Sequence, residues 1–320
     1  MSGVLAFQLY NWHFFFQQVI GGLTAGSLYA LIALGYTMVY GVLKLLNFAH
    51  GDVYMVGAYI GWFVLNALGS PTHPELSLVP LLLVAFLASM IGCGVLGVAI
   101  ERFAYRPLRN APRIAPLITA IGISFFLEQT AVLLWGANPR QYDMFDLHNG
   151  ELFGFVTIGN LQIEYVQILV VVGTVALMLG LGLFVQRTRT GKAMRAISYD
   201  REAASMMGID VDFVIAVTFL IGSALAGAAG VMTGLVSPTG SLNPYMGFGA
   251  GLKAFTAAVV GGIGNIGGAV LGGLFIGMVE TFTVAYLSSQ FSDLILFSIL
   301  IIFMLFRSTG FRGAPVLQKV

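Results

Sequence analysis

The chain has 320 residues, of which 58% are hydrophobic and 9% are charged, and its formal net charge is +1. A soluble domain carries about 25% charged residues, so this composition excludes an ordinary soluble protein and predicts an integral membrane protein. The small net charge gives no indication of a nucleic-acid partner. Runs such as 166–184 are continuously apolar, which excludes the alternation of a transmembrane barrel.

Apolar runs of membrane length follow one another along the whole chain. A spanning helix needs about 20 mostly apolar residues, and the sequence predicts spans at 14–40, 46–67, 76–100, 114–136, 165–186, 212–236, 246–262, 266–288 and 293–307. We therefore predict one domain over residues 1–320, an all-α polytopic bundle of about 8–9 transmembrane helices with short cytoplasmic coupling helices. Glycines in the first and seventh runs could break a helix, which would make either run a re-entrant piece.

Basic residues collect in three places: Arg102, Arg106, Arg109 and Arg113; Arg187, Arg189, Lys192, Arg195 and Arg201; and Arg307, Arg312 and Lys319. Because Lys and Arg accumulate on the cytoplasmic side of membrane proteins, these regions and the C-terminus should face the cytoplasm. Nine spans then place the N-terminus outside. Segment 137–164 should be the longest external loop. Its external position follows from its charges, because its one basic residue, Arg140, is outnumbered by acids at Asp143, Asp146, Glu151 and Glu164.

Glycines recur four residues apart, in the pairs Gly22 and Gly26, Gly57 and Gly61, Gly268 and Gly272, and Gly273 and Gly277. This spacing lets helices approach closely in lipid, either within one subunit or at an interface between subunits. The segment GIGNIG at 262–267 matches the letters of a dinucleotide fingerprint. It lies between apolar spans instead of in a βαβ unit, so we expect a turn there.

The chain lacks the sequence signals of an enzyme. Its Gly191-Lys192 pair is followed by Ala193, and Gln186 stands where a P-loop needs glycine. No Ser-His-Asp arrangement and no metal-ligand spacing occurs, and Cys93 is the only cysteine. We therefore predict that this chain is not an enzyme and that it binds no metal, ATP or other cofactor itself.

Several polar residues lie at or near membrane depth: Asn47, His50 and Asp52 in the segment NFAHGD, and Glu128, Lys253 and Glu280 within apolar runs. Charges at this depth are costly and mark a transport path or a buried pair. For His50 and Asp52, the alternative is that they cap the second span near its cytoplasmic end. For Lys253 and Glu280, the alternative is a mutual ion pair that holds two helices together.

The longest polar stretch with helical signals lies at about 187–211. Asp200 is a candidate N-cap, Glu202 adds an acid to the first turn, and Gly208 provides a C-terminal stop. These signals predict a short helix of about two turns, with Ala203 and Ala204 and two methionines, Met206 and Met207, on its surface. Such a surface suits docking into a groove, although an interfacial helix lying on the membrane would look similar.

Five stretches resemble one known family, the permease subunits of ATP-binding-cassette importers for branched-chain amino acids, of the LivH type. They are GGLTAGSLYALIALGYTMVYG (21–41), LNFAHGDVYMVGAYIG (46–61), ERFAYRPLR (101–109), GKAMRAISYDREAASMMGID (191–210) and NPYMGFGAGLKAFTAAVVGGIGNIGGAVLGG (243–273). They occur in order over nearly the whole chain.

The resemblance implies an importer of leucine, isoleucine and valine in the bacterial inner membrane. Its partners would be a second homologous permease, two ATPase subunits that hydrolyse ATP on the cytoplasmic face, and a periplasmic substrate-binding protein that docks at the external loop. The short helix would be the coupling helix that docks into an ATPase subunit. The family's coupling segment then corresponds to Gly191, Arg195, Asp200, Arg201, Glu202, Ala203, Ala204, Met207 and Gly208.

Three alternatives stay open on the sequence alone. Related permeases carry urea or short-chain amides, and none of the quoted motifs indicates recognition of a branched side chain. A self-sufficient secondary transporter could use Glu128, Lys253 and Glu280 as an ion or proton relay. A purely structural membrane scaffold would transport nothing.

Overall fold

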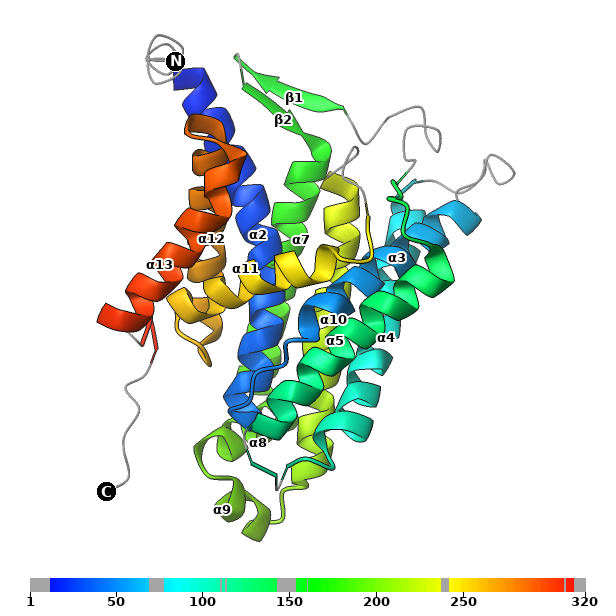
Figure 1. The fold of residues 1–320 in the computed structure, drawn as a ribbon, viewed down its shortest axis with the longest axis vertical. Coiled ribbons are helices and arrows are strands. Elements are labelled where there is room, and N and C mark those ends of the chain that lie inside the picture. Colours follow the sequence, from blue (N-terminus) through cyan, green and yellow to red (C-terminus); the bar gives the residue numbers. More distant parts are fainter. Residues whose placement is uncertain are drawn as a thin grey trace.

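The computed structural model describes residues 12–68, 78–109, 111–112, 114–142, 154–159, 161–236, 242–307 and 309–313. The first part contains α2 (Trp12–Leu43), α3 (His50–Leu68), α4 (Leu78–Ile100) with its π-helical extension η1 (Glu101–Tyr105), α5 (Ile114–Trp135) and α7 (Tyr165–Arg187). Two short helices follow, α8 (Arg189–Tyr199) and α9 (Arg201–Met206). The chain continues through α10 (Val211–Val236), α11 (Met246–Gly261), α12 (Ile266–Tyr286), the 3-10 turn η3 (Ser289–Phe291) and α13 (Ser292–Phe306) (Figure 1).

The long helices lie where the apolar runs predict them, so the all-α membrane bundle is confirmed. Within the described ranges, seven helical segments are long and apolar enough to cross a membrane. The other two predicted spans are α11, which has 16 residues, and α3, which begins with His50 and Asp52 in its first turn. The first run contains no break, because α2 is one continuous helix of 32 residues.

The two ends of the bundle differ in structure. At one end lie α8 and α9, and at the other lies a small antiparallel hairpin of β1 (Phe155–Ile158) and β2 (Leu161–Glu164), paired from Phe155↔Glu164 to Ile158↔Leu161 (Figure 1). The hairpin belongs to the predicted external loop and was not predicted as strand. Of the charges used to orient the chain, Arg113, Lys319, Asp143, Asp146 and Glu151 lie outside the described residues.

Helices α2–α5 and α10–α13 form an inverted repeat. Helix α2 packs on α12 as α10 packs on α4, α3 packs on α10 as α11 packs on α2, and α3 contacts α5 as α11 contacts α13. The equivalent helices run in opposite directions, since α2 runs toward α8 whereas α10 runs away from it (Figure 1). Inverted repeats of this kind place the transport path of many membrane transporters at the interface between the two halves.

The inverted repeat is also visible in the sequence, although it was not predicted there. Leu46 and Leu242, Asn47 and Asn243, and Gly51 and Gly247 are separated by the same number of residues. The local structure repeats as well, because the N–H of His50 donates to Asn47 and that of Met246 donates to Asn243, both at 3.1 Å. Each Leu-Asn segment therefore ends in the same turn and starts a helix.

The glycine pairs pack helices within the chain. A Cβ placed on Gly277 would lie 2.2 Å from the backbone nitrogen of Gly26, and one on Gly57 would lie 2.6 Å from the Cα of Gly227. The GIGNIG segment forms the predicted turn between α11 and α12, where Gly262 and Gly264 have φ of 105° and 93°. Close backbone contact thus replaces large side chains at the helix crossings, as expected in lipid.

Candidate functional site

Thr188 forms the joint between α7 and α8. Its N–H donates to the carbonyl oxygen of Phe184 at 3.1 Å, which ends α7. Its hydroxyl oxygen accepts from the N–H of Gly191 at 3.0 Å, which starts α8. A Cβ on Gly191 would lie 2.4 Å from the Phe184 oxygen, so this glycine lets α8 fold back against the end of α7.

Helix α8 holds the rest of the segment against the bundle. Gly191, Met194 and Ile197 are buried, and their spacing of three residues places them on one face of the helix. That face packs on α2, α7 and α10. Residues 189–199 were not predicted as a helix of their own, although Thr188 as an N-cap and the regular apolar spacing indicate one.

Helix α9 confirms the short helix predicted after Asp200. The Asp200 carboxylate accepts from the N–H groups of Glu202 and Ala203, both at 3.0 Å. Gly208 ends the turn with φ of 81°, a left-handed conformation that glycine adopts without strain. Both ends of α9 are therefore defined by the residues that the sequence suggested.

The exposed residues of α9 and its C-terminal cap include an alanine and two methionines. Ala204 is buried, whereas Glu202 and Ala203 are exposed, and the side chains of Met206 and Met207 are 82% and 83% exposed. Among the other predicted coupling residues, Arg195 and Arg201 are exposed and Gly191 is buried. Gly191 and Ala204 therefore position the segment, while the exposed residues form a surface that a partner could contact.

In the middle of the bundle, α3 and α11 begin against each other (Figure 1). A Cβ on Gly51 would lie 2.3 Å from the carbonyl oxygen of Gly247, and a Cβ on Gly247 would lie 2.5 Å from Oδ1 of Asp52. The His50 ring lies against Gly35 of α2, which at 1.5 Å per residue is roughly 12 Å before the end of that helix. Helices α3 and α11 thus begin against each other inside the bundle.

The polar residues predicted at this depth gather around the start of α3. Asn47, His50 and Asp52 are all buried. Tyr105 donates a hydrogen bond to Oδ1 of Asn47 at 3.2 Å, and Ser124 of α5 donates one to Oδ2 of Asp52. Asp52 lies in the first turn of α3, where a negative charge is favourable.

Some of these polar atoms have no partner among the described residues: Nδ1 and Nε2 of His50 and Oδ1 of Asp52. The His50 ring instead packs edge-on against Tyr36, with 4.8 Å between the ring centroids. Glu128, on the same helix as Ser124, is also buried. Ser124 was not predicted as a site residue, because a single serine in an apolar run gives no sequence signal until the fold places it beside a carboxylate.

Lys253 and Glu280 pair with each other. Nζ of Lys253 lies 2.6 Å from Oε1 of Glu280 and 3.1 Å from Oδ1 of Asp293. Because these residues come from α11, α12 and α13, the pairs join three helices of the second repeat. Asp293 was not predicted as a site residue, and Glu128 lies on α5 in the other repeat.

Known proteins match this chain over most of its length. Residues 18–305 match the family described as the permease component of branched-chain amino acid transport systems. The high-affinity branched-chain amino acid transport system permease protein BraD of Pseudomonas aeruginosa is 46% identical over 307 residues, covering 96% of this chain and 98% of the relative. The corresponding protein LivH of Escherichia coli is 44% identical over 313 residues, with the same two coverages.

A more distant relative is a probable branched-chain amino acid transport permease, LivH of Methanocaldococcus jannaschii, which is 30% identical over 85% of this chain. The family model and the relatives agree. The chain belongs to the family of permease components of branched-chain amino acid transport systems.

Proposed function

We propose that this chain is the membrane-spanning subunit of an ATP-binding-cassette importer that carries leucine, isoleucine and valine across the bacterial inner membrane. It would act with a second homologous permease, two ATPase subunits and a periplasmic substrate-binding protein. The end of the bundle with α8 and α9, together with the C-terminus, would face the cytoplasm, and the hairpin would face the periplasm. ATP would be hydrolysed by the partner ATPases.

The observation that carries the proposal is the construction of α9. Its exposed alanine and methionines form a surface without bulky branched side chains, and methionine adapts readily to a partner groove. The ends of α9 are defined by Asp200 and Gly208, and α8 packs on α2, α7 and α10. A partner that pushes on α9 would therefore push on the bundle instead of on a loose loop.

Substrate would pass near the central meeting of α3 and α11. Asn47, His50, Asp52 and Glu128 would face the path once α3 and α11 separate. The unpaired atoms of His50 and Asp52 could then meet solvent or substrate. The Lys253 ion pairs would keep α11, α12 and α13 moving as one body.

The proposal is tested in the assembled transporter with two substitutions on α9. Glu202→Lys reverses an exposed charge, and Ala203→Trp adds a bulky group to an exposed position. Both should release the ATPase subunits during co-purification and abolish uptake of radiolabelled leucine, while the amount of permease in the membrane stays unchanged. The matched control is Ala137→Trp, the same substitution at an exposed alanine at the opposite end of the molecule, which should retain both ATPase subunits.

Retention of the ATPases by both α9 variants would contradict docking at α9. The substrate is tested separately by uptake into proteoliposomes that contain the complete transporter. Leucine should be accumulated on addition of ATP and binding protein, and urea should not. Uptake of urea but not leucine would overturn the substrate assignment while leaving the coupling surface in place.

A further inference from the structure

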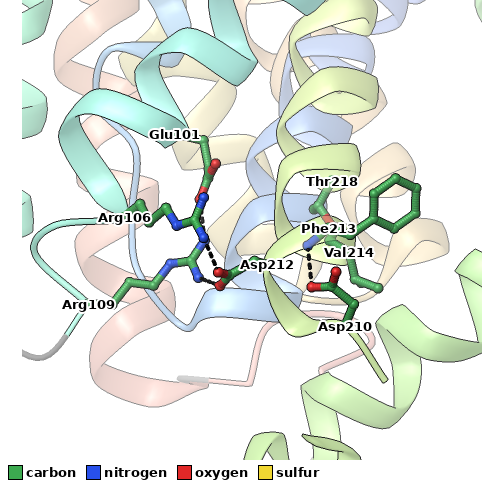
Figure 2. A network of polar contacts seen from close by, with 8 residues as sticks. All are labelled: Glu101, Arg106, Arg109, Asp210, Asp212, Phe213, Val214 and Thr218. Atoms are coloured by element: carbon green, nitrogen blue, oxygen red, sulfur yellow. Dashed lines mark hydrogen bonds and ion pairs between the residues drawn. The ribbon is translucent and has the colours of Figure 1, made fainter. Parts of the chain in front are cut away.

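Four charged side chains join the end of α4 to the start of α10, directly after the coupling segment. Figure 2 shows the Arg109 guanidinium between two carboxylates, donating to Oε1 of Glu101 through one nitrogen and to Oδ1 of Asp212 through the other. Arg106 donates to the second oxygen of Asp212. The fold thus places the motif ERFAYRPLR (101–109) beside Asp212, at the start of the second repeat.

The cluster has a buried core and a half-exposed arm. The side chains of Arg109 and Glu101 are 7% and 3% exposed, whereas those of Arg106 and Asp212 are 38% and 43% exposed. Because the Arg109 guanidinium donates through two nitrogens, it fixes both the distance and the relative orientation of the two carboxylates that it binds. Asp212 is therefore held in a defined place relative to the end of α4, although it remains partly open to solvent.

Local sequence explains how Arg109 reaches both acids. The π-helical turn η1 ends with the N–H of Arg106 donating to the carbonyl oxygen of Glu101 at 2.8 Å. Pro107 follows, and proline cannot continue a helix because it lacks an N–H and its ring clashes with the preceding turn. The chain therefore turns back, and Arg109 lies beside Glu101. Wide turns of this type occur frequently at functional positions.

The cluster is connected to the centre of the bundle through Tyr105, which directly precedes Arg106 in the chain. Tyr105, the last residue of η1, donates its hydroxyl toward the carbonyl oxygen of Leu46 and Oδ1 of Asn47, both at 3.2 Å. Its ring also packs on Phe219 of α10, with 5.3 Å between centroids. Asn47 lies in the turn that starts α3. Asp212, Arg109, Tyr105 and Asn47 thus connect the coupling segment to the central crossing.

The repeat provides an internal comparison for this junction. The equivalent junction at the other end of the molecule lies between the start of α2 and the end of α12, and there the described contacts are aromatic. Phe14 meets Tyr286 at 5.5 Å and Phe15 meets Phe282 at 5.4 Å between ring centroids. At the end that carries α8 and α9, the junction is ionic instead, because Arg109 pairs with Asp212 there.

We infer that Arg109 and Asp212 are positioning residues for transport, forming an ionic link that passes movement of the coupling segment through η1 and Tyr105 to the start of α3. The inference rests on the proposed coupling role of α8 and α9. Because α10 follows α9 directly, any displacement of α9 acts on Asp212 first. The two-armed pair then moves the end of α4 with α10, and the Tyr105 hydroxyl carries the movement to Asn47.

The test compares ATP hydrolysis with leucine uptake in proteoliposomes that contain the complete transporter. Asp212→Asn removes the half-exposed charge, and Tyr105→Phe removes only the hydroxyl while keeping the buried ring, so both variants should fold. Each should lower the number of leucine molecules taken up per ATP hydrolysed by about tenfold, a typical size for coupling between sites. The ATPase subunits should remain bound and hydrolysis should continue.

Two controls separate a link from a general structural role. Asp210→Asn removes a charge two residues away and keeps a side chain that can accept the capping bond from Phe213, so uptake per ATP should not change. Asp212→Glu keeps the charge and should retain most of the coupling. If the residues act in one series, Asp212→Asn combined with Tyr105→Phe should be no worse than the more severe single variant.

Unchanged uptake per ATP in both single variants would overturn the link, as would fully additive defects in the double variant. Loss of the ATPase subunits from Asp212→Asn would also overturn it, because the cluster would then belong to the docking surface. The proposed function fails by a different result, namely ATPase retention in the Glu202→Lys and Ala203→Trp variants. A transporter that loses its ATPases on those changes but keeps normal uptake per ATP in Asp212→Asn would reject the link alone.

Discussion

The closest contact between α2 and α12 predicts that adding a single methyl group will weaken the bundle. In Gly277→Ala, the new Cβ would lie 2.2 Å from the backbone nitrogen and 2.3 Å from the Cα of Gly26. These neighbours are backbone atoms, which cannot rotate away as a flexible side chain can. Non-bonded carbon atoms pack at about 3.5 Å or more, so the new Cβ and the Cα of Gly26 must move apart by about 1.2 Å.

The expected loss is about 1–3 kcal/mol, the usual cost of inserting an extra methyl group into a close-packed interface. Alanine also favours a helix over glycine by about 1 kcal/mol. The measured loss of stability is therefore the cost of the clash minus this gain. For a chain of this size, we expect the Tm to fall by roughly 2–6 °C.

The assay is thermal unfolding of the purified chain in detergent at one scan rate, because unfolding of large proteins is often irreversible. Gly122→Ala on α5 is the matched control, since a Cβ there has nothing within 4 Å. It should leave the Tm unchanged or raise it slightly through the same helix preference. Equal Tm values for Gly277→Ala and Gly122→Ala would refute the argument that close backbone contact limits this position.

Three further substitutions probe other parts of the structure. Asp200→Ala removes the cap of α9 and should cost about 1 kcal/mol locally, seen as faster hydrogen exchange in 202–207 while α10 is unchanged. Tyr142→Phe removes the hydroxyl that donates to Ala58 at 2.7 Å and should lower stability by about 1 kcal/mol; no change in Tm would contradict it. Lys253→Met should cost about 3–5 kcal/mol by leaving Glu280 unpaired, and adding Glu280→Leu should recover most of that loss.

The parts of the site that sequence could predict are those defined by neighbouring residues. Asp200, Glu202 and Gly208 mark the two ends of α9 because capping depends on residues within one helical turn. The pairing of Lys253 with Glu280 was one of two alternatives, because charges buried in a membrane need partners. The third member, Asp293, could not be chosen, since nothing in the sequence states that α13 packs beside α11.

Other residues acquire a role only when distant segments meet. Ser124 becomes relevant because α5 brings it to Asp52, and Arg109 becomes the centre of a cluster because α10 presents Asp212 to it. The inverted repeat could have been found in the sequence from the recurrence of Leu-Asn and glycine at constant spacing. Its meaning needed the structure, which shows the two glycines of that repeat packed against each other.

The amino-acid sequence alone predicts a membrane protein built as a helical bundle, the positions of its long helices and the short helix that follows Asp200. These properties follow from composition, apolar run length and local capping, which act over a few turns of helix. The tertiary structure was needed to show that α3 and α11 begin against each other inside the bundle, and that an ionic cluster joins the end of α4 to the start of α10. The reason is physical: close backbone packing and buried ion pairs depend on which helices are neighbours, and that choice is made by the whole bundle.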